Sequence, residues 1–162
     1  MTDRTPALDA LERAGVLYTV VRTQRAHSAE ESATLQGIEL GALLRTIVVR
    51  RGDDDYVFVL VPGGRRFDWP KVRGHLGVKR LSLPDAEEAL AVTGYERGAI
   101  TPFGATRAWP VIVDASAVAR GRVAVGGGAH GVNVHLAPAD LIAALDAAAV
   151  DVTVPEASTP DL

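Results

Sequence analysis

The chain has 162 residues, of which 48% are hydrophobic and 23% charged, and this length and composition fit one globular domain. It has no cysteine, which excludes disulfides, thiolate catalysis and cysteine-ligated zinc, and its net charge of −3 argues against DNA as a partner. No apolar run approaches the roughly 18 residues of a membrane helix and the first residues lack the apolar stretch of a signal peptide, so we expect a cytoplasmic protein with no membrane partner.

The first half of the chain predicts two capped helices followed by a long hairpin. Thr5 and Pro6 have the N-cap and N1 pattern of a helix, and Ser28 with Glu31 forms a capping box. The second hairpin strand, YVFVLV, is apolar at every position, so it should be central and covered on both faces. The elements expected here are a helix at 5–15, a strand at 18–22, a helix at 28–37, a helical turn at 41–44 and strands at 46–51 and 56–61.

The second half predicts shorter elements around one long irregular stretch, 94–109, which carries Gly, Pro and Thr without periodicity. The expected elements are a helix at 66–75 interrupted by Pro70, a strand at 79–82, a helix at 84–92, strands at 110–114, 122–125 and 132–136, a helix at 138–148 and an edge strand at 150–154. The whole is a single α/β domain, residues 1–154, in which a mixed, partly antiparallel sheet has flanking helices. Residues 155–162 form a polar tail that we expect to be disordered.

The charges are unevenly distributed along the chain. Residues 45–80 carry nine Lys or Arg against four Asp, so this segment is +5 and the remainder is −8. Such an asymmetry can place a basic face on an acidic protein, although a block of charge can also serve solubility alone. Arg45 stands just before the apolar run TIVV, where it is either a solvated edge residue or a cation that points into a site.

Two motif interpretations fail on context. Gly126, Gly128 and Gly131 match G-x-G-x-x-G, but the dinucleotide fingerprint requires a following helix, and VNVHL alternates like a strand. The histidines His130 and His135, placed on one strand, would point to opposite faces, and no histidine pair has zinc-ligand spacing. We therefore expect no cofactor and no metal. The glycines instead predict a hairpin whose backbone N–H groups can bind an oxygen atom.

Four segments, in this order, resemble the YbaK/ProX family of aminoacyl-tRNA deacylases, the free-standing relatives of the editing domain of bacterial prolyl-tRNA synthetases. The resemblance runs from about residue 7 to residue 154. The segments are HSAEESA at 27–33, LLRTIVVRRGDDDYVFVLVPGGRRFDWPKV at 43–72, TGYERGAITPFG at 93–104 and GGGAHGVNVHLAPADL at 126–141.

The resemblance implies an activity and a set of site residues. Family members hydrolyse the ester of a mischarged tRNA in trans, such as alanyl- or cysteinyl-tRNA(Pro), without a metal, so the implied partner is the aminoacylated 3′ end of tRNA, with an aminoacyl-tRNA synthetase as a further candidate partner. The implied catalytic residues are Arg45 and Asn133. The implied substrate-binding residues are His27, Gly98, Thr101, Pro102, Phe103, Gly104, Gly126 and Gly127.

At three positions the chain departs from the family pattern, with Arg45 at the usual lysine, Asn133 at the usual acid and Gly126 at a frequent serine. Arginine keeps the charge but has a longer, planar head, and asparagine cannot act as a general base. Three hypotheses therefore stay open: a deacylase of prolyl-type or related specificity, a catalytically weak or inactive module that binds the tRNA end, and an unrelated small-molecule or protein-interaction role on the same fold.

Overall fold

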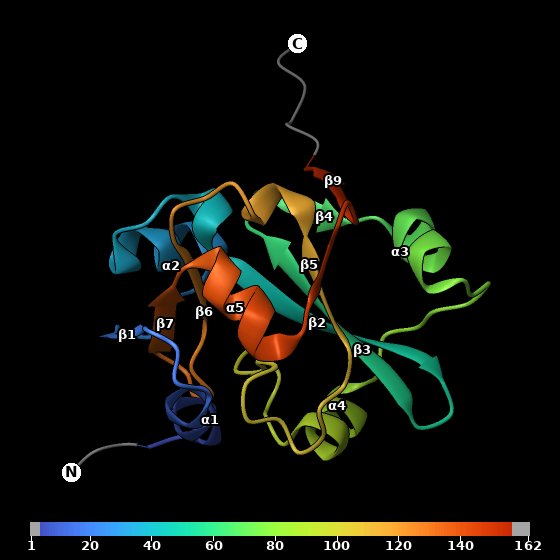
Figure 1. Ribbon diagram of the computed structural model, residues 1–162, viewed down its shortest axis with the longest axis horizontal. Coiled ribbons are helices and arrows are strands. Elements are labelled where there is room, and N and C mark those ends of the chain that lie inside the picture. The colour runs from blue at the N-terminus through green and yellow to red at the C-terminus, as the bar shows by residue number, and fades with distance from the viewer. Residues whose placement is uncertain (1–3, 157–162) are drawn as a thin grey trace.

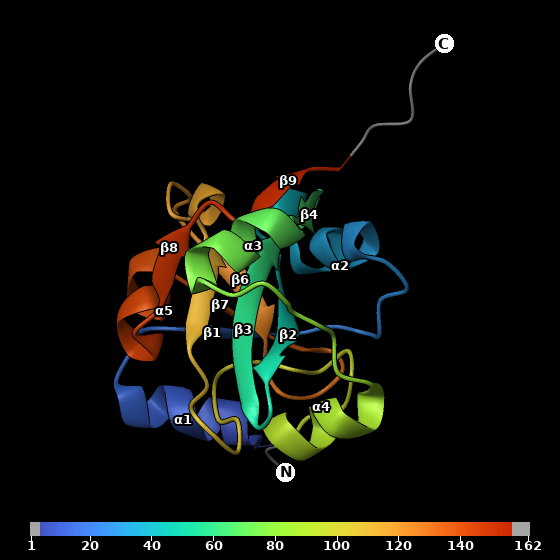
Figure 2. The ribbon, with the colours of Figure 1, turned by 90° about the vertical axis from the view of Figure 1, so that its right-hand side faces the viewer.

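The computed structural model describes residues 4–156 and shows two packed layers of strands with helices around them (Figures 1 and 2). The helices are α1 (Pro6–Ala14), α2 (Ala29–Gln36), α3 (Trp69–Leu76), α4 (Ala86–Thr93) and α5 (Pro138–Leu145), with short 3-10 turns η1 (Leu40–Ala42) and η2 (Ala115–Ala117). The strands are β1 (Thr19–Arg22), β2 (Leu44–Gly52), β3 (Asp55–Pro62), β4 (Arg65–Phe67), β5 (Val111–Asp114), β6 (Val123–Gly126), β7 (Val132–Leu136), β8 (Ala148–Val150) and β9 (Thr153–Pro155).

The strands form one mixed sheet, one antiparallel sheet and a small ribbon. The mixed sheet has the order β2-β3-β5-β8, in which β2 and β3 are antiparallel while β5 and β8 run parallel to β3. The antiparallel sheet has the order β1-β7-β6, and β4 pairs with β9. A parallel bridge between Leu43 and Ala124 joins the first two sheets at the start of β2. The predicted fold class, a mixed and partly antiparallel α/β domain, is confirmed.

Strand β3 is buried on both faces, as its unbroken apolar sequence predicts, and its alternate side chains enter two different cores. Phe58 and Leu60 pack in the larger core with α1, α5, β6 and β7. Val57, Val59 and Val61 pack in the smaller core with Val72 of α3, and Figure 2 shows α3 lying across this face. All five side chains are at most 1% exposed, so β3 forms the common wall of both cores.

Four local expectations are wrong. The turn expected at 41–44 is η1 at Leu40–Ala42, because Leu44 already pairs with Pro62 in β2. Pro70 does not interrupt a helix but occupies the first turn of α3, where its missing N–H costs no hydrogen bond. The helix expected at 138–148 ends at Leu145, and Ala148–Val150 is strand β8. Of the strand expected at 79–82, only a bridge between Ser82 and Arg50 forms.

The end of the chain pairs with the domain. The sequence predicts an edge strand at 150–154 and a tail from 155, but Val150 ends β8 and a separate strand, β9, runs to Pro155, which pairs with Arg65. The rest of the predicted tail, 157–162, lies outside the described residues. Backbone pairing with the β4 segment thus reaches into the expected tail as far as Glu156, whose N–H donates to the Gly64 carbonyl at 3.0 Å.

A buried carboxylate holds this last segment in place. Asp114, whose side chain is 2% exposed, accepts hydrogen bonds from the Val152 N–H at 3.0 Å and from the Ser116 N–H at 3.2 Å. Arg65 Nε lies 3.7 Å from the carboxylate and donates to Thr153 Oγ1 at 2.6 Å. Burial pushes the pKa of Asp114 upward, but the hydrogen bonds from Ser116, Val152 and Thr153 outweigh it and hold the pKa below its ordinary value.

Replacing this carboxylate should loosen the C-terminal segment. We expect Asp114→Ala to lower the free energy of unfolding by about 3 kcal/mol, because it leaves buried donors without an acceptor. A matched control is Asp151→Ala, whose 66% exposed side chain pairs with Lys71 and should cost less than about 1 kcal/mol. Urea denaturation of the three proteins measures both differences.

The effect should also depend on pH. Because the folded-state pKa of Asp114 is depressed, its contribution is fully present above the ordinary pKa of 3.8 and is lost as pH falls through the folded value. The stability difference between the wild type and Asp114→Ala should therefore shrink in acid. A difference that is the same at pH 7 and pH 3 would contradict the assigned role of the ionised carboxylate.

Candidate functional site

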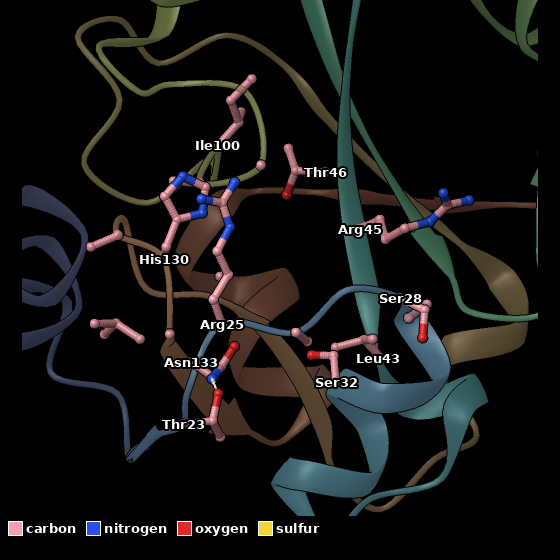
Figure 3. A pocket seen from close by; sticks show the side chains of 18 of the residues that line it. Thr23, Arg25, Ser28, Ser32, Leu43, Arg45, Thr46, Ile100, His130 and Asn133 are labelled. Atoms are coloured by element: carbon pink, nitrogen blue, oxygen red, sulfur yellow. Dashed lines mark hydrogen bonds between the residues drawn. The ribbon is translucent and has the colours of Figure 1, made fainter.

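A cavity of about 560 Å³ lies at the free edge of β2, between the two sheets. Its walls come from four segments that are far apart in the sequence: 23–32, 43–47, 97–100 and 126–133. Figure 3 shows α2 below the cavity, β2 crossing behind it and the loop with Ile100 above it. Each of the segments singled out in the sequence contributes to this one space. They are the start of α2, the strand at Arg45, the loop GAITPFG at 98–104, here called the G-x-x-x-P loop after its Gly98 and Pro102, and the glycine hairpin.

The edge of β2 offers backbone groups to the cavity. Arg50 exchanges backbone hydrogen bonds with Ser82 on the side of β2 that faces away from β3. Backbone groups of alternate residues in an antiparallel strand point to the same side, so the N–H and C=O of Thr46 also point away from β3. Since β2 is the edge strand and Thr46 lines the cavity, these groups are available to a ligand.

The side chain of Thr46 also lacks a partner. Its Oγ1 atom is buried and, among the described residues, has no hydrogen-bond partner. An unsatisfied buried hydroxyl is costly, and such groups recur at sites that bind a ligand or an ordered water. No sequence pattern indicates this, because Thr46 has the character of an ordinary β-branched strand residue.

Asn133 presents an acceptor to the cavity. Its Nδ2 donates to the Val21 carbonyl at 3.1 Å and to Thr23 Oγ1 at 3.5 Å. The reversed amide would set Oδ1 against the Val21 carbonyl, which is also an acceptor, so the orientation is chemically fixed. Oδ1 therefore remains free and points into the cavity (Figure 3). An oxygen held in this way can accept a hydrogen bond from a ligand or a water molecule but cannot take up a proton at neutral pH.

Arg45 lies on the rim of the cavity. It follows Leu44 in β2, is exposed, and has no hydrogen bond or ion pair among the described residues. Because side chains alternate along a strand, Arg45 and Thr46 lie on opposite faces of β2. Figure 3 shows the Arg45 guanidinium pointing away from Asn133 and His130. Arg45 can therefore reach a part of a ligand that extends out of the cavity.

Three of the other expected site residues also line the cavity, namely His27, Gly98 and Gly126. The ring of His27 is exposed, with Nδ1 3.4 Å from Glu31. Gly98 has a φ of 93° and faces His130, whose Cε1 would lie 3.0 Å from an added Cβ. A side chain at position 98 would therefore be both strained and crowded.

The remaining expected residues lie outside the cavity. Thr101 is fully buried, and Phe103 is 3% exposed in the larger core, where its carbonyl accepts from the Tyr95 hydroxyl. Pro102 is also buried. Gly104 has a φ of 71° and packs against Pro6, whose carbonyl oxygen would lie 2.3 Å from a Cβ there. The second half of the G-x-x-x-P loop thus anchors α1 to the core.

Gly127 also lies outside the cavity, and its backbone groups stabilise the fold. Its N–H donates to the Val132 carbonyl at 2.7 Å, closing the turn between β6 and β7, and its carbonyl accepts from the Thr5 hydroxyl at 2.6 Å. Both backbone groups are therefore occupied within the protein and neither is free for a ligand. Gly126 is the member of this pair that reaches the cavity.

The cavity has a cationic lining that the sequence did not indicate. Besides Arg45, it is lined by Arg25, Arg97 and His130, and among its described lining residues none is acidic. His130 lies in the turn before β7, within the hairpin connection expected from the sequence. Arg25 and His130 stand in irregular segments, where no periodicity tells which way a side chain points.

The larger basic segment is partly neutralised. Within residues 45–80, Arg50, Arg51, Arg65 and Lys71 each form an ion pair with an aspartate. The cations around the cavity thus differ from most of those that produced the +5 segment charge. In residues 4–156 no group of three His, Cys, Asp or Glu side chains is placed to hold a metal ion, and no helix of that part of the chain is long and apolar enough to span a membrane.

Fold and site together define a small α/β domain with a cation-lined cavity at the edge of a mixed sheet, a site suited to an anionic ligand. The model of the aminoacyl-tRNA editing domain family matches residues 23–144, most of the chain. The chain belongs to this family, and the resemblance drawn from its sequence is confirmed.

Individual relatives agree with this assignment. The chain is 27% identical over 129 residues to an Enterococcus faecalis protein provisionally named Cys-tRNA(Pro)/Cys-tRNA(Cys) deacylase EbsC, covering 80% of this chain and 79% of that one. It is 33% identical over 121 residues to the proline–tRNA ligase of Desulfovibrio desulfuricans, covering 75% of this chain but 20% of the ligase. A crystal structure described provisionally as a trans-editing enzyme for prolyl tRNA synthetase superposes with a TM-score of 0.84 and 26% identity, covering 92% of this chain and 95% of that one.

The unpartnered hydroxyl of Thr46 leads to a prediction about stability. We expect Thr46→Val, which keeps the shape and removes the hydroxyl, to raise the free energy of unfolding by about 1 kcal/mol, since it deletes an unsatisfied buried group. Thermal and urea unfolding measure the change. A loss of stability would show that the hydroxyl has a partner, such as a bound water, in the ligand-free protein.

Proposed function

We propose that this protein hydrolyses the ester of a mischarged tRNA in trans. The observation that carries the proposal is the convergence on one cavity of Arg45, the edge of β2 at Thr46, Gly98 and the fixed acceptor of Asn133. Membership of the editing-domain family supports the substrate class. The name of the E. faecalis relative makes Cys-tRNA(Pro) a first substrate to test.

The cavity suits a reaction in which water is the nucleophile. An aminoacyl ester is already activated, so orientation of water and backbone donors aimed at the developing oxyanion can supply the rate enhancement. The N–H of Thr46, directed away from β3, is a candidate donor. Asn133 Oδ1 can hold the attacking water or the α-ammonium group but cannot remove a proton. The proton therefore has to leave through the substrate or through solvent.

The cationic rim suits the RNA part of the substrate. An acyl group in the cavity would leave the terminal nucleotide and its phosphate at the rim, where Arg25, Arg45 and Arg97 lie. Guanidinium groups bind phosphate oxygens through paired, charge-assisted hydrogen bonds. The proline–tRNA ligase relatives carry the matching segment within a much longer chain, which supports a synthetase as the partner that supplies tRNA identity.

The alternative function is a module that binds the aminoacyl end without turnover. It is favoured by Asn133, which has no basic function, and by the outward direction of Arg45 (Figure 3). Both functions require that the protein binds acyl-tRNA. Only the deacylase makes acyl-tRNA decay faster with the protein than without it.

The activity test uses a panel of mischarged tRNAs that includes alanyl- and cysteinyl-tRNA(Pro). We expect faster deacylation than in buffer, and Arg45→Ala should lower kcat/KM by roughly 10- to 100-fold, the value of one charge-assisted hydrogen bond. Arg45→Lys tests whether charge alone suffices.

The matched control is Arg80→Ala, which removes an exposed cation outside the cavity and should leave the rate unchanged. No acceleration with any tRNA would exclude the deacylase and favour the binding module. Equal rates for the wild type and both Arg45 variants would remove Arg45 from the site.

Binding should depend on salt through the rim. For single-stranded nucleic acid, the slope of log K against log salt changes by roughly 0.7 for each phosphate neutralised. We expect Arg25→Ala to reduce the slope for an acceptor-end oligonucleotide by about this amount and Arg80→Ala to leave it unchanged. Fluorescence anisotropy at several salt concentrations gives the slopes, and affinity that is insensitive to salt would contradict a phosphate-binding rim.

A further inference from the structure

A chain of three polar side chains connects the cavity with the protein interior. His135 of β7 and Gln36 of α2 are 4% and 7% exposed, and His135 Nε2 lies 2.9 Å from Gln36 Oε1. Gln36 Nε2 in turn donates to Ser32 Oγ at 2.9 Å. Ser32, one helical turn earlier in α2, lines the cavity. Two buried polar residues thus fix the position of one hydroxyl group at the cavity wall.

The direction of each hydrogen bond follows from the orientation of the Gln36 amide, which sets Nε2 against Ser32 and Oε1 against His135. Gln36 Oε1 is only an acceptor, so His135 must donate to it from Nε2. The amide nitrogen of Gln36 is only a donor, so Ser32 Oγ must accept from it. Burial, and to a lesser extent the charge of Arg122, lowers the pKa of His135 and favours the neutral ring. A neutral His135 with its proton on Nε2 therefore leaves the hydroxyl proton of Ser32 unused.

That proton has no acceptor among residues 4–156, which the structure describes. A helical serine or threonine commonly donates to the carbonyl four residues earlier, as Thr34 does to Glu30 at 3.0 Å. Ser32 makes no such bond among the described residues, and only its backbone N–H donates to the Ser28 carbonyl. The Ser32 hydroxyl is therefore a donor directed by its neighbours toward the cavity.

An acceptor faces it from the other wall. Both amide hydrogens of Asn133 are engaged, which fixes the direction of Oδ1, and no described residue donates to that oxygen. Figure 3 shows the oxygens of Ser32 and Asn133 pointing toward the space between α2 and β7. A donor and an acceptor across one space complement a group that both accepts and donates. An ammonium cannot accept and a carbonyl cannot donate, whereas a hydroxyl does both, as does the water that occupies such a site when no ligand is bound.

We propose that Ser32 and Asn133 recognise a hydroxyl group of the substrate, and that Gln36 and His135 are positioning residues that keep Ser32 a donor. The proposal rests on the proposed function, because the cavity must hold the aminoacyl end. The hydroxyl has two sources in such a substrate, the side chain of a seryl or threonyl group and the ribose 2′ position. A site built to hydrogen-bond a hydroxyl discriminates strongly against the analogue that lacks it.

The test measures binding and so does not require turnover. Four adenosine mimics carry a stable 3′-amide link to serine or alanine, each with a 2′-hydroxyl or as the 2′-deoxy compound, and titration calorimetry gives their Kd. We expect the wild type to prefer one hydroxylated partner, and Ser32→Ala to reduce that preference roughly tenfold, the effect of one neutral hydrogen bond. Tighter binding of the seryl than of the alanyl mimics would show that the recognised hydroxyl is that of the side chain. Tighter binding of the ribose than of the deoxyribose mimics would show that it is the 2′-hydroxyl.

Gln36→Glu tests the positioning role with little change of shape. A carboxylate at position 36 would accept from both His135 and Ser32, so Ser32 could no longer donate to the ligand, and the preference should fall as in Ser32→Ala. The matched control is Thr34→Ala, on the same helix but away from the cavity, which should bind like the wild type. In the unmutated protein, nitrogen chemical shifts of the His135 ring should show the proton on Nε2.

The outcomes separate the two proposals. If the wild type binds the mimics and Ser32→Ala leaves the preference among them unchanged, the hydroxyl recognition is overturned while the proposed function stands. A His135 proton on Nδ1 would reverse the Gln36 amide and overturn the positioning role. If the wild type binds none of the four mimics, the proposed function fails and the inference fails with it.

Discussion

The burial of β3 on both faces is the constraint on which the rest of the structure depends. A strand that is apolar at every position needs cover on each side, and here the two covers differ. On one side lies α3, and on the other lie α1, α5 and the sheet β1-β7-β6. The second cover is joined to the chain at the start of β2 by the backbone bridge between Leu43 and Ala124, and Leu44 and Val48 of β2 pack in the same core. Beyond that bridge the two sheets separate, and the edge of β2 from Leu44 to Ile47 is left to line the cavity.

The inner part of the site consists mainly of neutral polar groups whose hydrogen-bonding directions are fixed by the protein. The amide nitrogen of Asn133 donates within the protein, which directs its Oδ1 toward the cavity. The hydroxyl oxygen of Ser32 accepts from Gln36, which leaves its proton directed toward the cavity. Thr46 contributes a hydroxyl with no partner in the described chain. Such preorganisation costs no rearrangement when a ligand arrives. The Arg45 guanidinium at the rim has no hydrogen bond within the described residues, which suits the binding of a flexible phosphate backbone.

The family motif correctly indicated where in the chain the site lies, but it did not indicate which of its residues line the cavity. Within the G-x-x-x-P loop, Gly98 lines the cavity, whereas Thr101 and Phe103 are core residues. The motif could not separate them because a loop has no periodicity that assigns faces. Similarly, Gly126 and Gly127 are adjacent and identical in sequence, yet only the first reaches the cavity. The backbone turn that engages both polar groups of Gly127 decides this difference.

The sequence by itself determined the order of the elements, the central place of β3, the helix starts at Thr5 and Ser28 and the hairpin across GGGAHG, because caps, turns and hydrophobic alternation act over a few residues. The tertiary structure alone decided which side chains meet. Ser32 and His135 are separated by more than a hundred residues and share Gln36 only because α2 packs beside β7. The freedom of the Ser32 proton depends on hydrogen bonds between distant segments, and no local pattern can encode a contact that packing creates.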